Sequence, residues 1–340
     1  AMILGILAAS KDPSAAQATI VGGQAAAVQS QLNYSRDMER EADRIGFGVQ
    51  TQAGFAPQGF VSMFEKLQQS SRLNDVGGFP YLRSHPLNTE RIADMQSRVR
   101  QSDQVSIRPV TTLEHAMVAA RARVLSNSAV DALRIWAQEV QPGNLAKLPA
   151  AAQVGSLYGA TLAALKLRDF AQAQATLARL QERTTGDAAA ARLTHLLALE
   201  VSLVQGDVAT AARLLKASGT PADRSRAALL LGAQTDTLSG KGEAAAQNLQ
   251  TWVADHPRDA QAWQLLAAAN VAMGRPVAAV RAEAEVNVAQ LDYTAAFTRF
   301  KVAQDMARKS TRSADHIEAS IVDTRARQME SLLREQALER

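Results

Sequence analysis

The sequence contains no cysteine, which excludes disulfide bridges, zinc sites built on thiolates and cysteine nucleophiles. Aromatic residues make up only 4% of the 340 residues. Few segments show the alternation of β-branched residues that is typical of strands, and alanine is abundant throughout. This composition predicts an all-α protein with room for two or three domains.

The chain also lacks a strong charge of one sign. Its 37 basic and 33 acidic residues are interspersed and leave a net charge of +4. Because no basic stripe is present, we expect no nucleic-acid partner. The apolar residues 1–10 are too short to span a bilayer and lack the pattern of a signal peptide, so we interpret them as the tail of a helix and expect no transmembrane span.

A strong helix is predicted from Ser35, a suitable N-cap, to Gln52. Gly54 and Pro57 are typical of its end and of the start of the next helix, which should bury Phe60, Phe64 and Leu67. The predicted helix carries one apolar stripe, which we expect to be buried, formed by Met38, Ala42, Ile45 and Val49.

Two carboxylates, Glu39 and Asp43, lie four residues apart and therefore on one face of this helix. Carboxylates at the border of a buried stripe are costly unless a cation or a hydrogen-bond donor meets them. Taken alone, the pair is best explained as surface or salt-bridged carboxylates.

The surrounding motif resembles the zinc metallopeptidases of the gluzincin type, the family of the CAAX prenyl protease. Many members have a helix that reads Ser-Arg-x-x-Glu-x-x-Ala-Asp, and all five positions match here: Ser35, Arg36, Glu39, Ala42 and Asp43. Further matches follow in the expected order, namely Gly54-Phe55-Ala56-Pro57, His85-Pro86-Leu87 and Arg91-Ile92.

The resemblance implies a role for each matching side chain. Glu39 corresponds to the third zinc ligand, and Asp43 and Arg91 correspond to residues of the second shell, where Asp43 would orient a zinc-bound histidine. His85 corresponds to a histidine that can fill the open zinc position and hold the enzyme latent. Alternatively, His85 only caps or packs at the start of a helix.

One part of the zinc site is missing from this chain. No His-Glu-x-x-His string, which would carry two zinc ligands and the general base, occurs in the sequence, and the other four histidines are isolated. We therefore expect this chain alone to be inactive and to hold Zn²⁺ weakly or not at all. The general base is expected upstream in a longer protein, which we expect to be a zinc endopeptidase.

The rest of the chain contains an internal repeat. Gly206, Gly240 and Gly274 are 34 residues apart, and Ala211, Ala245 and Ala279 follow with the same period. This period, with a glycine at the turn and an alanine early in the second helix, resembles the tetratricopeptide repeat. Looser copies are predicted around Leu157–Ala173 and over residues 112–140.

These patterns predict three regions: a C-terminal portion of a zincin-like metallopeptidase domain (1–105), an α-solenoid of tetratricopeptide-like hairpins (111–290) and C-terminal capping helices (291–340). The last helix has a stripe that either caps the array or binds a partner: Ile317, Ile321, Val322, Ala326, Met329, Leu333 and Ala337.

The repeat alignment also predicts a partner-binding surface on the first helix of each hairpin. Its predicted residues, which mix amide and apolar side chains with little charge, are Gln261, Gln264, Ala268, Ala227, Leu230, Gln234, Leu193, Leu196 and Glu200. Such a surface suits an extended peptide. Alternatively, other parts of the chain fill it.

Two functions follow. The resemblance, together with the repeat array, indicates a periplasmic branch of the family, in which a zinc endopeptidase serves the quality control and assembly of outer-membrane β-barrel proteins. Its array would dock a protein or peptide substrate or the β-barrel assembly machinery. The alternative is a non-catalytic adaptor or chaperone scaffold, which an intact His-Glu-x-x-His upstream would contradict.

Overall fold

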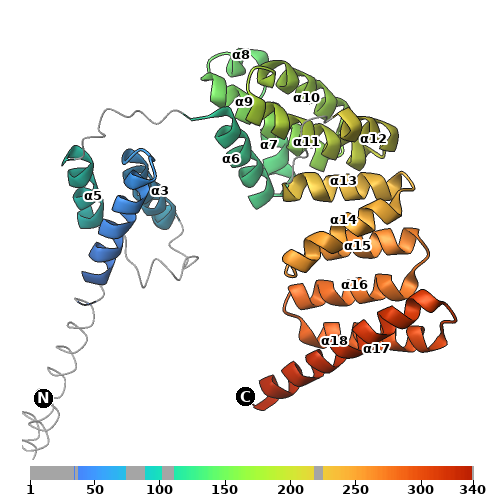
Figure 1. The fold of residues 1–340 in the computed structure, drawn as a ribbon. Helices are drawn as coiled ribbons and strands as arrows, with labels where there is room; N and C mark the ends of the chain where they lie inside the picture. The colour runs from blue at the N-terminus through green and yellow to red at the C-terminus, as the bar shows by residue number, and fades with distance from the viewer. Residues whose placement is uncertain (1–33, 35–36, 74–88, 102–110, 218–224, 339–340) are drawn as a thin grey trace, which may run out of the picture. The chain divides into compact units, whose positions relative to one another are not determined.

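The structure is a computed structural model that describes residues 34, 37–73, 89–101, 111–217 and 225–338. Every regular element in these residues is a helix, so the all-α prediction is confirmed. The contacts divide the chain into two compact units, residues 1–110 and 111–340 (Figure 1). None of the described helices has the length and hydropathy needed to cross a membrane.

The first unit contains a helix over residues 37–52, followed by α3 (Gln58–Leu73) and α5 (Thr89–Gln101). Their core is small and consists of buried Phe64, Ile92 and Met95, against which Phe47 and Phe60 pack. The rings of Phe47, Phe60 and Phe64 meet edge to face, with centroids 6.1 and 5.1 Å apart. The predicted burial is confirmed for Phe64, whereas Phe60 is partly buried and Leu67 is 37% exposed.

The predicted apolar stripe of the 37–52 helix is not buried. Met38, Ile45 and Val49 are 54%, 51% and 62% exposed. The helix instead turns Asp43 and Phe47 toward its neighbours, about 100° around its axis from the stripe. The prediction was wrong because apolar periodicity shows which residues share a face but not which face the neighbouring helices cover.

The second unit is a series of antiparallel helical hairpins (Figure 1). Its helices are α6 (Leu113–Ser126), α7 (Val130–Gln138), α8 (Pro142–Leu145), α9 (Ala150–Lys166), α10 (Phe170–Thr184), α11 (Ala188–Gln205), α12 (Val208–Ala217), α13 (Arg226–Leu238), α14 (Gly242–Asp255), α15 (Ala260–Ala272), α16 (Pro276–Ala289), α17 (Tyr293–Lys309) and α18 (Ser313–Leu338). Helices α9 and α10 form the hairpin predicted around Leu157–Ala173, whereas α6 and α7, at residues 112–140, both pack mainly on α9.

The glycines that recur every 34 residues form the same turn in each hairpin. At Gly206, Gly240 and Gly274 the backbone is left-handed, with φ of 84°, 78° and 65°. Each glycine N–H donates to the carbonyl three residues earlier, and the next N–H donates to the carbonyl five residues before it. The same bonds occur at Arg168 and Leu291, which adopt φ of 60° and 64° without being glycine.

Small residues let the hairpins pack closely. Ala211, Ala245 and Ala279, which recur with the 34-residue period, are 0–2% exposed. Aspartates start several of the helices, since the side chains of Asp169, Asp187, Asp259 and Asp292 accept hydrogen bonds from the first turns of α10, α11, α15 and α17.

The first hairpins form a closed bundle around α9. Residues Leu157–Leu165 of this helix are all buried. Helix α6 packs along α9 and also reaches α11, where Arg121 forms two hydrogen bonds with Glu200, at 2.8 and 3.2 Å, and Arg192 pairs with Glu114 at 3.3 Å. The first helix of the array therefore lies against the surface of α11 that the repeat pattern offered to a partner.

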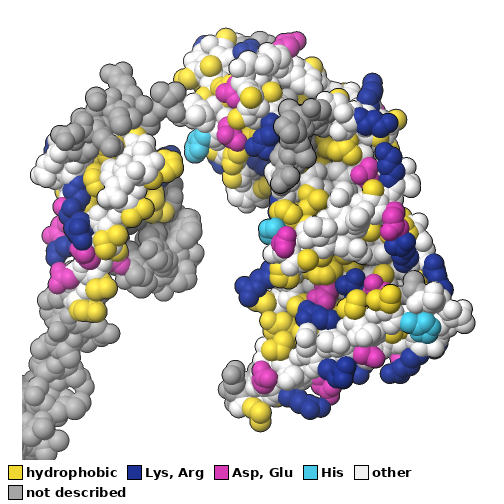
Figure 2. Space-filling model, in the orientation of Figure 1, with side chains coloured by type: hydrophobic (Ala, Val, Ile, Leu, Met, Phe, Trp, Pro, Cys, Tyr) yellow, Lys and Arg dark blue, Asp and Glu magenta, His cyan; other side chains and the backbone are white. Residues whose placement is uncertain are grey.

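The last helix packs on its own array. In α18, Val322, Ala326 and Met329 are at most 2% exposed and contact fully buried Phe300 of α17. Two ion pairs join α16 to α18. In one, Arg281 of α16 contacts Glu318 of α18 at 2.5 Å; in the other, Glu285 of α16 contacts Arg325 of α18 at 2.6 Å. Ile317 and Ile321, predicted in the same stripe, are 71% and 38% exposed, and charged side chains intersperse along α18 (Figure 2).

The left-handed residues give a first prediction. Leu291→Gly should raise the free energy of unfolding of the array by about 0.5–1 kcal/mol, because a side chain costs about 1–2 kcal/mol in this conformation and glycine loses part of that gain to chain entropy. Leu291 is 63% exposed, so little packing is lost. Urea unfolding measures the change. Gly240→Ala is the reverse substitution at an equivalent turn and should lower the free energy of unfolding by about 1 kcal/mol. Equal urea midpoints for the two variants would contradict the assignment of these turns.

Candidate functional site

A buried cluster of one cation and two carboxylates lies between the 37–52 helix and α5. Arg91 donates from Nε and Nη2 to the two carboxylate oxygens of Asp43, at 2.7 and 2.6 Å. Its Nη2 also lies 3.0 Å from Oε2 of Glu39. One guanidinium thus contacts both carboxylates of the predicted motif.

The cluster is shielded from water. The side chains of Arg91, Glu39 and Asp43 are 11%, 12% and 6% exposed. The guanidinium carbon lies 5.0 Å from the centroid of the Phe64 ring, within the range of a cation–π contact. Bidentate, charge-assisted hydrogen bonds of this length are the strong class of such interactions.

The local sequence explains how the cluster forms. Glu39 and Asp43 are one helical turn apart, so their side chains project in the same direction. Arg91 lies in the first turn of α5, next to Ile92, which anchors α5 in the core. The requirement stated from the sequence, that a cation must meet these carboxylates, is satisfied by a residue 48 positions further along the chain.

Among the candidate site residues of this unit, the structure therefore brings together Glu39, Asp43 and Arg91. His85 lies outside the described residues, and its closing role stays a prediction. Within the described part of the chain, no three His, Cys, Asp or Glu side chains gather closely enough to hold a metal ion. Glu39 has the oxygen chemistry of a zinc ligand, but the described residues do not complete a site.

The family comparison matches this unit. The model of Peptidase family M48 matches residues 1–99. The resemblance to zinc metallopeptidases is confirmed. We refer to residues 1–99 below as the M48 segment.

Curated relatives extend the match beyond the M48 segment. A "Putative beta-barrel assembly-enhancing protease" of Vibrio cholerae serotype O1 is 27% identical over 307 residues, which are 88% of this chain and 60% of that protein. The "Beta-barrel assembly-enhancing protease" of Escherichia coli (strain K12) is 28% identical over 287 residues, 82% of this chain and 55% of that protein. The chain thus spans only 55–60% of the length of these relatives.

A shorter match concerns the "Mitochondrial metalloendopeptidase OMA1" of Saccharomyces cerevisiae, which is 31% identical over 74 residues, 21% of each chain. The bacterial relatives match both the M48 segment and much of the helical array, because 307 aligned residues exceed the 99 of the segment. The similarity to the bacterial relatives therefore includes both the M48 segment and the helical array that follows it.

The predicted partner-binding surface of the array is only partly free. Gln234 on α13 and Gln261 and Gln264 on α15 are exposed, as predicted. Leu230, also predicted at the surface, is 5% exposed because it belongs to the core between α13 and α14. On α11, Glu200 is engaged by Arg121 of α6. The accessible part of this surface therefore lies on α13 and α15, which pack side by side.

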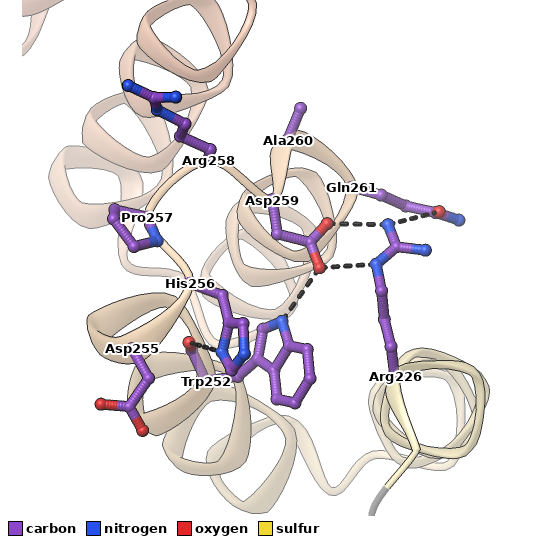
Figure 3. Close-up of a pocket in the computed structure, with 9 residues that line it drawn as sticks. All are labelled: Arg226, Trp252, Asp255, His256, Pro257, Arg258, Asp259, Ala260 and Gln261. Carbon is purple, nitrogen blue, oxygen red and sulfur yellow. Dashed lines mark hydrogen bonds and ion pairs between the residues drawn. The ribbon is translucent and has the colours of Figure 1, made fainter. Parts of the chain in front are cut away.

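A pocket of about 700 Å³ borders this surface at the start of α13 and α15 (Figure 3). Arg226 donates to both carboxylate oxygens of Asp259 at 2.7 and 2.8 Å and to Gln261 at 3.2 Å. The Trp252 indole N–H donates to the same carboxylate at 2.9 Å, and the Trp252 ring stacks on His256 with centroids 3.8 Å apart.

Gln261, predicted for the partner-binding surface, lines this pocket, whereas Arg226, Trp252 and His256 were not among the residues predicted from the sequence. The only available signal was Asp259 at a helix start, and it does not indicate which arginine lies opposite. The side chain of Asp259 is 8% exposed, whereas that of Arg226 is 50% exposed. The pair joins two successive hairpins and holds the amide of Gln261 at the pocket wall.

This pocket gives a second prediction. The hydrogen bonds from Arg226 lower the pKa of Asp259 to about 2, although partial burial opposes them. Because the pKa is lowered by folding, the stabilisation is present above about pH 4 and is lost as the pH falls toward about 2. Asp259→Asn should remove this dependence, which we expect to be about 1 kcal/mol or less because Arg226 is solvent-screened.

Urea unfolding of the chain and of Asp259→Asn between pH 2 and 5 measures the difference. Asp255→Asn, which changes an exposed carboxylate in the same pocket, is the matched control. Parallel curves for the parent chain and Asp259→Asn would show that the ion pair contributes nothing.

Proposed function

We propose that the complete protein is a zinc-dependent endopeptidase acting in the quality control and assembly of outer-membrane proteins in the periplasm. The observation that carries this proposal is the buried Glu39–Arg91–Asp43 cluster inside an M48 segment. The similarity to bacterial β-barrel assembly-enhancing proteases supports the substrate class.

In this proposal Glu39 supplies one of the zinc ligands. Two histidines and the general base belong to the His-Glu-x-x-His motif, which this chain does not contain. Zinc, when bound, would polarise a water molecule for attack on a peptide bond. Glu39 contributes a negative charge held in place at low exposure, and Asp43 and Arg91 fix the direction of its side chain.

The exposed apolar stripe of the 37–52 helix is a surface on which another segment of the proposed zinc site can pack. Met38 and Ala42 directly precede Glu39 and Asp43, so the stripe adjoins the carboxylates about 100° around the helix. Exposed apolar side chains in a row are typical of a surface that another element covers. We propose that the segment with the remaining zinc ligands packs on this stripe and thereby approaches Glu39.

We further propose that the array is a tetratricopeptide-like scaffold that docks an extended segment of the substrate or of the assembly machinery. The supporting observation is that the uncharged residues Gln234 on α13 and Gln264 and Ala268 on α15 are exposed. Amide groups beside small apolar side chains suit the backbone of an extended peptide.

The alternative function is a non-catalytic adaptor. It is supported by the size of the array, which makes up the second unit, residues 111–340. The two functions differ in what Glu39 does, because an adaptor needs no zinc ligand.

The third prediction tests the enzyme. Glu39→Gln in the complete protein should lower the zinc content to less than about half and abolish proteolysis, because one of three protein ligands loses its charge. Metal analysis and a casein or self-cleavage assay measure the two effects. Glu41→Gln, an exposed glutamate two residues away, is the matched control and should keep both. Full zinc occupancy in Glu39→Gln would show that Glu39 is not a zinc ligand.

The fourth prediction tests the docking surface. Gln234→Glu combined with Gln264→Glu should weaken site-specific crosslinking to envelope partners several-fold, because two charges replace amides at a neutral surface. Both positions are exposed, so the circular dichroism spectrum should not change. Gln247→Glu with Gln250→Glu, exposed on α14, is the control. Equal crosslinking by both double variants would exclude α13 and α15 as the docking site.

A further inference from the structure

We propose that the array carries a second docking surface, a row of apolar side chains that fits one face of an acidic amphipathic helix from a partner protein. Val204 and Val271 are the last residues but one of α11 and α15, and Leu238 is the last residue of α13. We call these three residues the apolar row. The row takes no part in the proposed zinc chemistry, so this inference goes beyond the peptidase function.

The apolar row repeats one outward-facing position of the hairpin. Val204, Leu238 and Val271 are 42%, 54% and 63% exposed, and each lies two or three residues before the left-handed glycine that follows its helix. Val204 and Leu238 are separated by the 34-residue period, which the exposed Ala272 continues beside Val271. A single exposed apolar side chain needs no explanation, whereas a position that recurs in three successive hairpins forms one surface.

The packing of the helices sets the spacing of the row. Helix α13 packs against both α11 and α15, and the ends of the three helices lie along one edge of the second unit (Figure 1). The axes of packed helices lie about 8–10 Å apart. Neighbouring members of the row, which occupy similar levels on their helices, are therefore separated by about the same distance.

This spacing distinguishes a helical partner from an extended one. Residues seven apart on a helix share one face and lie about 10.5 Å apart along its axis. Residues on one face of a strand lie about 6.6 or 13 Å apart, and neither value matches the row. A helix that crosses α11, α13 and α15 can therefore place one apolar side chain per heptad against each of them.

Basic side chains border the row at the turns. Lys241 and Arg275 directly follow the left-handed glycines after α13 and α15, and their side chains are 55% and 40% exposed. Two acids lie close to them, Asp236 at 3.9 Å from Lys241 and Glu243 at 2.6 Å from Arg275. Arg312 adds a third cation, since it donates to the carbonyl of the glycine after α15. Figure 2 shows Lys and Arg side chains along this edge.

The charges around the row select the polar faces of the partner helix. The cations at the turns after α13 and α15 exceed the acids beside them by one, which favours acidic residues on that flank of the partner. On the opposite flank, Gln234 and Ala268 are exposed and uncharged, about one helical turn before Leu238 and Val271. The surface thus fits a helix with apolar residues seven apart and acids along one side.

The test uses the whole chain and labelled synthetic helical peptides of about three heptads, built from alanine, glutamate and leucine. In the first peptide the leucines are seven residues apart. The second has the same composition with leucines five residues apart, which places them on different faces, and the third has lysine in place of glutamate. We expect the first to bind saturably in fluorescence anisotropy and the other two at least about tenfold more weakly.

Variants of the chain locate the site. Leu238→Gln should weaken binding of the first peptide about tenfold, because a leucine contact buried in the complex is lost. Val118→Gln on α6 is the matched control, since Val118 is 53% exposed and lies outside the row, and it should bind as the parent chain does. All these positions are exposed, so the circular dichroism spectra should agree. Lys241→Glu with Arg275→Glu should weaken the glutamate peptide and strengthen the lysine peptide, a reversal that unfolding would not produce.

Three results would overturn the inference. The first is a lack of saturable binding, or equal affinity for all three peptides. The second is an equal loss of affinity in Leu238→Gln and Val118→Gln. The third is co-sedimentation of the chain with phosphatidylglycerol vesicles that Leu238→Gln abolishes, because the row would then bind a lipid surface. The zinc measurements on Glu39→Gln do not involve the array, so failure of the peptidase proposal is distinguishable from failure of this one.

Discussion

A helical hairpin cannot bury its apolar faces alone, and most of this structure follows from that constraint. Each hairpin of the second unit covers the previous one, so the core continues through the clusters around Leu157, Leu266 and Phe300. The left-handed turns after α11, α13 and α15 keep the two helices of each hairpin antiparallel, and buried alanines keep them close. The ends of such an array need a different solution, because their last faces have no further hairpin.

The two ends solve this problem differently. At the start, α6 packs along α9 and is joined to α11 by the pairs Arg121–Glu200 and Arg192–Glu114. At the other end, α18 covers α17 and is fixed to α16 by the oppositely directed pairs of Arg281 and Glu285. Both closures leave α13 and α15 as the accessible middle, which is where the exposed glutamines and the Trp252 pocket lie.

In the first unit, the packing of the helices depends on the cost of burying charged side chains. Two carboxylates one helical turn apart repel each other and lose hydration, and a single guanidinium compensates both. Because Arg91 belongs to α5, the compensation also joins α5 to the 37–52 helix. The charged cluster and the small aromatic core are therefore adjacent, and the site proposed for zinc coincides with the most constrained part of this unit.

The all-α class, the 34-residue period and the motif around Glu39 and Asp43 could be predicted from the sequence, since they depend on local patterns of residue type and spacing. The packing of the helices was needed to show that Arg91 contacts those carboxylates, that Met38, Ile45 and Val49 face outward, and that Leu230 is buried and Glu200 is paired with Arg121. The physical reason is the same in each case: helical periodicity determines which side chains share a face, whereas the packing of distant segments determines which face is covered and which charges meet.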